Sequence, residues 1–240
     1  MIYEIAGLRV FLDNKSPYTD KYCKAYLSAD QDTPADIYAS VTKEEMQEEK
    51  RLTPQFPDGY IENICLYRSL CRQIPALNRI LLHSSIISYD GKAYGFLGRS
   101  GTGKSTHTRL WFKYVNGVDI VNGDKPILEY KNGEFWAYGT PWMGKEGWGK
   151  NTLACLKGLC FLEQAQENEI VPLSKSQAVA RIFTQVFLPE EETAVAQTLE
   201  LIDKLVEIIP MYLLKCTISQ DAVRCSYEAL TGNVYKRIGE

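Results

Sequence analysis

A glycine-rich octapeptide constrains this chain more than any other segment. Residues 98–105 read GRSGTGKS and fit the phosphate-loop pattern G-x-x-x-x-G-K-[ST] in full. In such a loop the glycines let backbone N–H groups turn inward around phosphate oxygens. The lysine reaches the outer phosphates, and the Ser/Thr hydroxyl joins the shell of a Mg²⁺ ion. The pattern therefore indicates a bound nucleoside triphosphate, and it requires a strand before the loop and a helix after it.

The flanks of the loop supply that context. Residues 94–97 are apolar and aromatic, which is typical of a buried strand. Residues 105–114 contain neither proline nor glycine, and Leu110, Trp111 and Tyr114 recur at helical spacing. The N-terminus of that helix adds a partial positive charge to the phosphate site. A glycine-rich turn with a surface lysine is the alternative, and the full match with correct flanks speaks against it.

The bulk composition limits the class of protein. The 240 residues are 45% hydrophobic and 24% charged, which is ordinary for a globular protein. The net charge of −3 gives no reason to expect nucleic acid or an anionic membrane as partner. No apolar run reaches the length of a membrane span, and the first residues do not resemble a signal peptide. Seven cysteines without a C-x-x-C pair indicate reduced thiols, so we expect a cytoplasmic protein.

The N-terminal region, residues 1–78, is expected to be strand-rich and to pack on the rest of the chain. Strands are predicted over 2–12 and 37–41. Thr42 and Glu45 form a capping box before a short charged helix over 43–52. A second helix is expected to end before Pro75.

Residues 79–240 are expected to form one domain that carries the phosphate loop. Asp-Gly and Asn-Gly turns join a strand over 80–89 to one over 92–97, and another pair over 127–130 and 134–138. Such hairpins predict a mixed sheet in an α/β (α+β) fold, unlike the repeated βαβ units of most phosphate-loop proteins. Further strands are expected over 118–121, 153–164 and 211–217. Helices are expected over 174–187, opened by a capping box of Ser174 and Gln177, and over 190–208.

Asp124 is the best candidate for the carboxylate that a phosphate loop needs to hold Mg²⁺ or to position a nucleophile. It follows an apolar strand and lies one strand–loop step after the helix of the phosphate loop. A plain turn residue is the alternative, because Asn-Gly-Asp favours a turn on its own. The location favours a functional role.

The spacing from Lys104 to Asp124 resembles that of HPr kinase/phosphorylase and phosphoenolpyruvate carboxykinase. The resemblance covers residues 80–162, with the phosphate loop as its strongest part. His83 resembles the histidine that precedes the loop in HPr kinases. Closer still are HPr kinase-like bacterial proteins with SGTGKSTHT, a following Leu-Trp and a TPW-x-GK loop, here residues 100–108, 110–111 and 140–145. This likeness implies an HPr kinase C-terminal domain-like, carboxykinase-like core, with ATP and Mg²⁺ as cofactors.

The chain also departs from that family. Gly123 stands where the family usually carries a second aspartate, and Thr106 replaces the glutamate that follows the loop in true HPr kinases. The regulatory domain of those enzymes is not recognisable in residues 1–78, and their phosphorylase signature has no clear counterpart. Kinase activity therefore carries over better than HPr as substrate or phosphorylase activity.

A lone histidine in an apolar strand is usually a core residue, but the resemblance places His83 near Asp124, where it tunes the carboxylate or binds phosphate. Lys145 and Lys150 lie in a flexible glycine-rich loop, where they either neutralise charge on a transferring phosphoryl group or act as ordinary surface lysines. His107 is expected to be structural or on the surface.

The resemblance implies an ATP-dependent kinase that phosphorylates a hydroxyl, with a serine on a peptide, a protein or the free amino acid as acceptor. Asp124, His83 and Lys104 are the expected catalytic residues, and Ser105 and Asp124 the Mg²⁺ ligands. The residues expected to bind the nucleotide are Gly98, Ser100, Gly101, Thr102, Gly103, Lys104, Ser105 and Thr106. An ATP-binding regulator without transfer and a carboxykinase-type enzyme acting on a small acid are the alternatives. A homo-oligomer stays open, because HPr kinases assemble as hexamers.

Overall fold

The computed structural model describes residues 1–236 and contains, in that range, one nine-stranded mixed sheet with strand order β4-β8-β9-β10-β6-β5-β7. Strand β12 pairs with β10 beside this path, and β11 pairs with β12. The strands of this sheet are β4 (Arg79–Leu81), β5 (Ser84–Tyr89), β6 (Lys92–Leu97), β7 (Asp119–Asn122), β8 (Ile127–Lys131), β9 (Glu134–Tyr138), β10 (Leu153–Gln164), β11 (Glu169–Pro172) and β12 (Met211–Cys216). The predicted mixed sheet in an α/β fold is confirmed.

Strand β10 organises the sheet because it has different neighbours at its two ends. Its first residues pair antiparallel with β9, and residues 159–164 pair parallel with β12. Along its other edge it pairs parallel with β6, the strand that leads into the phosphate loop. The carboxyl ends of β6, β10 and β12 therefore meet at one edge of the sheet.

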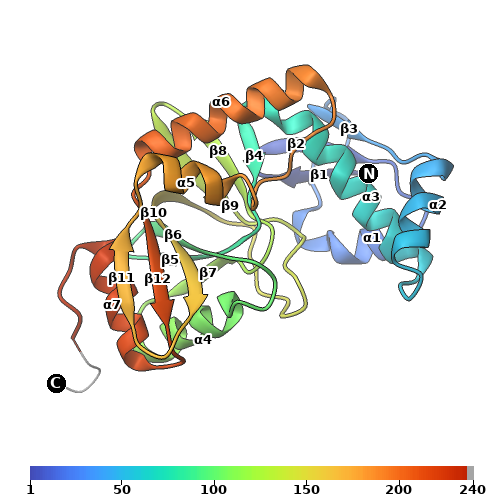
Figure 1. Ribbon diagram of the computed structural model, residues 1–240. Coiled ribbons are helices and arrows are strands. Elements are labelled where there is room, and N and C mark those ends of the chain that lie inside the picture. The colour runs from blue at the N-terminus through green and yellow to red at the C-terminus, as the bar shows by residue number, and fades with distance from the viewer. Residues whose placement is uncertain (237–240) are drawn as a thin grey trace.

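Helices cover both faces of the sheet (Figure 1). Helices α5 (Lys175–Ile182) and α6 (Glu192–Ile208) lie along one face and bury a core with side chains such as Leu156 and Leu205. Helices α4 (Lys104–Tyr114) and α7 (Gln220–Thr231) lie along the other face, around Trp111 and Val223. Because helices cover both faces of the sheet, β6 and β10 are buried and apolar on both sides.

The N-terminal elements stand beside the sheet (Figure 1). They comprise a three-stranded sheet in the order β1-β2-β3 and helices α1 to α3. Their bounds are β1 (Ile2–Ile5), β2 (Leu8–Leu12), α1 (Pro17–Tyr22), η1 (Lys24–Tyr26), β3 (Ile37–Ala39), α2 (Lys43–Leu52), α3 (Asp58–Gln73) and η2 (Ile74–Leu77). The hydrophobic core of this region also contains Leu81, Ile127 and Trp142, so it packs on the main sheet. The boundary after residue 78 stays a prediction.

Several local predictions agree with these elements. The capping box of Thr42 and Glu45 opens α2, and that of Ser174 and Gln177 opens α5. Helix α5 ends at Ile182, earlier than the predicted 187. Helix α1, strand β11 and helix α7 are additional elements that no sequence pattern predicted. Within residues 1–236 no helix has the length and apolar character needed to cross a membrane.

The predicted continuous strand over 80–89 is wrong. It divides into β4 and β5 because the two pieces have different partners. β4 pairs with β8, while β5 pairs with β6 and β7. The division falls at Leu82 and His83, and the backbone N–H of His83 donates to the carbonyl of Gln185 at 2.7 Å. The break sets His83 outside the regular ladder, at the edge of the candidate site.

Candidate functional site

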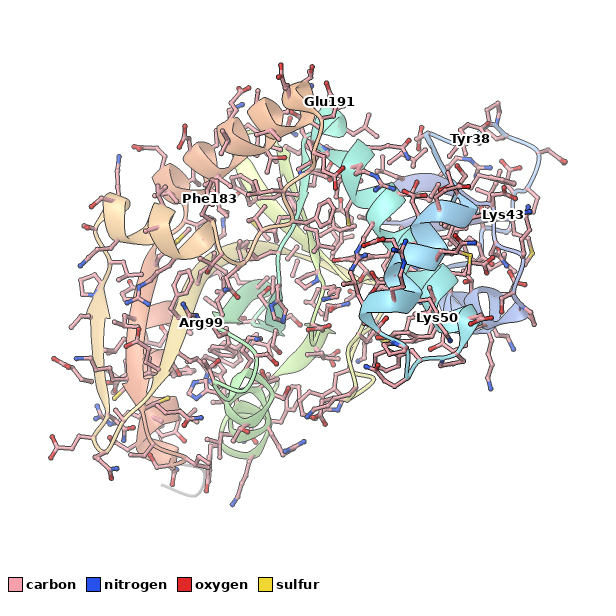
Figure 2. All side chains as sticks on the ribbon, turned by 45° about the vertical axis from the view of Figure 1, so that its right-hand side comes forward. Tyr38, Lys43, Lys50, Arg99, Phe183 and Glu191 are labelled. Carbon is pink, nitrogen blue, oxygen red and sulfur yellow. The ribbon has the colours of Figure 1, made fainter. Side chains whose placement is uncertain are left out.

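The phosphate loop, residues 98–105, joins β6 to α4. Gly98, Gly101 and Gly103 all have positive φ (+149°, +85° and +108°), a region that side-chain-bearing residues rarely adopt. Gly103 is the N-cap of α4 and has no side chain to occupy the first N–H groups of the helix. These donors are therefore free to bind an anion, in the direction of the helix dipole. In Figure 2 the label of Arg99 marks this loop.

Lys104 holds the loop in shape. Its side chain is 9% exposed, and its Nζ donates a hydrogen bond to the carbonyl oxygen of Gly98 at 2.7 Å. Burial lowers the pKa of Lys104, and the charge of Asp124 partly offsets this effect. A buried ammonium with one neutral partner is under-satisfied, so an added phosphate group would stabilise it.

Asn122 fixes the turn that carries Asp124. Its fully buried side chain accepts hydrogen bonds from the backbone N–H groups of Asp124 (2.9 Å) and Lys125 (2.7 Å). Its Nδ2 donates to the carbonyl of Thr140 at 3.0 Å. Asn122 thus ties the end of β7 to the following loop and positions the Asp124 carboxylate.

Asp124 lies between two basic side chains. His83 Nε2 is 3.2 Å from its Oδ1, and Lys125 Nζ is 3.4 Å from its Oδ2. Burial raises the pKa of the Asp124 carboxyl, but the hydrogen bond from His83 and the positive charge of Lys125 outweigh burial, so the pKa lies below its ordinary value. The carboxylate is ionised at neutral pH, as a metal ligand must be.

A polar cavity of about 350 Å³ brings most of the expected residues together. From the sequence prediction it contains His83, Ser100, Gly101, Gly103, Lys104, Ser105, Thr106, Asp124 and Lys145. Two predicted nucleotide contacts face elsewhere. Thr102 turns its hydroxyl to the carbonyl of Arg99 (2.8 Å), and Gly98 contributes its carbonyl to Lys104.

The glycine-rich loop over 139–149 closes one side of this cavity at Asp124. Gly144 has φ +71°, and a Cβ on it would lie 2.9 Å from the Cβ of Asp124. The N–H of Gly123 donates to the carbonyl of Trp148 at 2.7 Å. A Cβ on Gly123 would lie 3.1 Å from that same oxygen, so the loop leaves little room for a larger residue. This contact accounts physically for glycine where the resembling family carries aspartate.

The two loop lysines are placed differently. Lys145 lines the cavity together with Glu146. Lys150 instead forms an ion pair with Asp119, with Nζ 2.7 Å from Oδ1, and is not among the residues that line the cavity. Of the two, Lys145 is the one that the structure brings to the site.

Sequence reasoning missed Arg109 and Lys125. Arg109 lines the cavity from the second turn of α4, where it pairs with Glu146 (3.1 Å) and lies 5.2 Å above the ring of Trp148. Its position four residues, about one turn, after Ser105 was a usable signal, because residues at this spacing share a face of the helix. Lys125 directly follows Asp124, but the sequence alone does not determine the direction in which the Lys125 side chain points.

His107 and Trp142 are structural. His107 is fully enclosed, its Nε2 lies 2.9 Å from Ser226 Oγ, and burial lowers its pKa to about 3. Trp142 is buried and lies with its ring 4.9 Å from that of Tyr67.

The described residues do not form a metal site that is built from protein ligands alone. Among residues 1–236 no group of three or more His, Cys, Asp or Glu side chains is arranged to hold a metal ion. Ser105 and Asp124 line the same cavity and offer one hydroxyl and one carboxylate. That donor set fits Mg²⁺, which usually takes one or two protein oxygens and completes its shell with phosphates and water.

Comparison with known proteins identifies one family. The model of the family described as "SynChlorMet cassette protein ScmC" matches residues 61–222. The match covers more than half of the chain, and the chain belongs to this family. It includes every residue that lines the cavity. No curated protein matches the chain.

Proposed function

We propose that this chain, as a member of the ScmC family, is an ATP-dependent kinase with an HPr kinase-like core that transfers the γ-phosphoryl group to a hydroxyl acceptor. One observation carries the proposal: the His83–Asp124 pair faces the phosphate loop across a single polar cavity. A nucleotide-binding loop and an ionised carboxylate are the two parts that phosphoryl transfer requires.

The phosphate loop supplies binding and charge compensation. Backbone N–H groups at the start of α4 and the ammonium of Lys104 hold the outer phosphates. Ser105 and Asp124 would hold Mg²⁺, which neutralises charge as it develops on the phosphoryl group. Arg109 and Lys145 add positive charge from the other walls of the cavity.

Asp124 is suited to orienting the acceptor more than to removing its proton. A carboxyl with a lowered pKa is a weak base. The transition state of phosphoryl transfer is loose, so the reaction depends mainly on position and electrostatics. In this proposal the hydrogen bond from His83 to Oδ1 keeps the Asp124 carboxylate in place.

The acceptor is proposed to be a serine hydroxyl of a peptide, a protein or the free amino acid. The likeness to HPr kinases supports serine. The family description names a cassette, so products encoded beside this gene are the first acceptors to test.

Transfer of label from γ-labelled ATP tests the proposal. Wild-type protein is expected to label an acceptor, and Asp124→Asn to reduce the rate by about a hundredfold or more, as expected for a residue that touches the reacting groups. Asp119→Asn is the matched control, because Asp119 begins β7, the strand that leads to Asp124, but pairs with Lys150 outside the cavity. Equal transfer by Asp124→Asn and wild type would contradict the role assigned to Asp124.

A regulatory protein that binds ATP without transfer is the second candidate. Gly123 favours this function. Its backbone lies against the carbonyl of Trp148, which leaves little room for a second aspartate at this position. Tight ATP binding with neither transfer to any acceptor nor slow hydrolysis would favour this function over the kinase.

A further inference from the structure

A second cavity lies on the other side of the phosphate loop. It measures about 410 Å³ and shares Gly101, Gly103 and Thr106 with the first. Its remaining walls are formed by Thr102, His107, Leu110, Gln164, Ala165, Gln166, Cys216, Thr217 and Ile218. The phosphate loop therefore separates two adjoining cavities.

The second cavity occupies the carboxyl edge of the parallel strands. Strands β6 and β12 both pair parallel with β10, and these three strands end at Leu97, Gln164 and Cys216. Loops that follow the carboxyl ends of neighbouring parallel strands form the usual crevice for ligands in α/β sheets. The cavity is built from the loops after all three ends.

The chemistry of the two cavities differs. The first contains Lys104, Arg109 and Lys145, which suit phosphate groups. The second has no Lys, Arg, Asp or Glu among its described lining residues, and its one histidine already faces Ser226. Its walls suit an uncharged part of the molecule whose phosphate groups would occupy the first cavity.

An aliphatic side chain stands exposed at the rim. Ile218 is 79% exposed, and Leu110 is half-buried on the helix opposite. Contact with a flat apolar ligand would remove part of the Ile218 and Leu110 side chains from water, which is favourable. A purine ring is such a ligand.

The polar groups favour adenine over guanine. Gln164 Nε2 donates to the carbonyl of Gly101 at 3.1 Å, so this side chain already bridges the loop and the second cavity. Gln164 and Gln166 are amides, which both donate and accept and so can pair with the edge of a purine. None of the described residues that line the cavity is an Asp or Glu, whose carboxylate would accept the adjacent N–H groups of guanine and so favour that base.

We propose that this second cavity is the nucleoside site, with adenine packed against Leu110 and Ile218 and the ribose crossing Gly101 to Gly103. The inference rests on the proposed function and adds the place of the base and the residues that contact it.

Binding measurements in the presence of Mg²⁺ test it with ATP, GTP and inorganic tripolyphosphate. Wild-type protein is expected to bind ATP more tightly than the other two. Ile218→Asp is expected to weaken ATP binding by about tenfold or more and to leave tripolyphosphate binding unchanged, since the base contact is lost while the phosphate contacts remain. Val234→Asp is the matched control, because Val234 is 78% exposed and lies outside the cavity.

The outcomes separate the two proposals. If Ile218→Asp binds ATP like wild type while Lys104→Ala loses both ligands, the base lies elsewhere and the inference is wrong, although the phosphate site stands. Equal affinity for ATP and GTP would also overturn it. If wild-type protein binds neither ATP nor tripolyphosphate, the proposed function fails and the inference with it. Unchanged thermal unfolding of Ile218→Asp verifies that the variant folds.

Discussion

Gly144 lies against Asp124 so closely that a Cβ at position 144 would stand 2.9 Å from the Cβ of the aspartate. Together with the hydrogen bond from Gly123 to the Trp148 carbonyl, this contact joins the 139–149 loop to the residue proposed to hold Mg²⁺. A change in the loop is therefore expected to alter the position of the carboxylate.

Gly144→Ala is expected to lower phosphoryl transfer by about tenfold, because the added methyl group displaces Asp124 or the loop above it. Gly147→Ala is the control. Both glycines have positive φ (+71° and +64°), so both variants lose about 1–2 kcal/mol of stability to backbone strain, but a Cβ at 147 meets no atom within 4 Å. Transfer rates and thermal unfolding of the two variants separate contact from strain. Equal rates would show that contact with Asp124 is unimportant.

Arg109→Ala is expected to raise KM for ATP by about tenfold, since a charge-assisted contact to phosphate is lost. Stability should change by less than about 1 kcal/mol, because the Arg109–Glu146 pair is partly exposed to water. Lys113→Ala removes another cation from the same helix, where the ammonium faces Tyr114 instead of the cavity. A similar rise in KM for both variants would point to a general charge effect and would exclude a specific contact.

His107 makes the stability of the ligand-free protein depend on pH. Because its folded pKa is about 3, below the ordinary 6.5, only the unfolded chain takes up a proton between these values. Its contribution to stability is complete above pH 6.5 and is lost as the pH falls toward 3, by about 1.4 kcal/mol per pH unit.

His107→Gln is expected to flatten this dependence, since glutamine keeps a hydrogen-bonding group but does not titrate. Urea unfolding of both proteins at pH 7 and pH 5 measures the difference. Parallel pH profiles would contradict the assignment.

Local sequence patterns predicted the elements whose conformation depends on neighbouring residues. Capping boxes placed the starts of α2 and α5, Asp-Gly and Asn-Gly turns placed the hairpins, and the glycines of residues 98–105 placed the phosphate loop between β6 and α4. These patterns act through steric limits on φ and through hydrogen bonds that span a few residues, so the sequence carries them directly.

The order of the strands in the sheet decided which side chains come together at the site. His83 meets Asp124 because β5 pairs with β7 and His83 lies in the break between β4 and β5. Lys150 pairs with Asp119 and does not line the cavity. The second cavity exists because β10 brings the ends of β6 and β12 together. By itself the sequence determined the phosphate loop and the carboxylate that follows it. Only the tertiary structure decided which distant side chains share their cavity, because pairing between strands far apart in the chain depends on packing of the whole sheet.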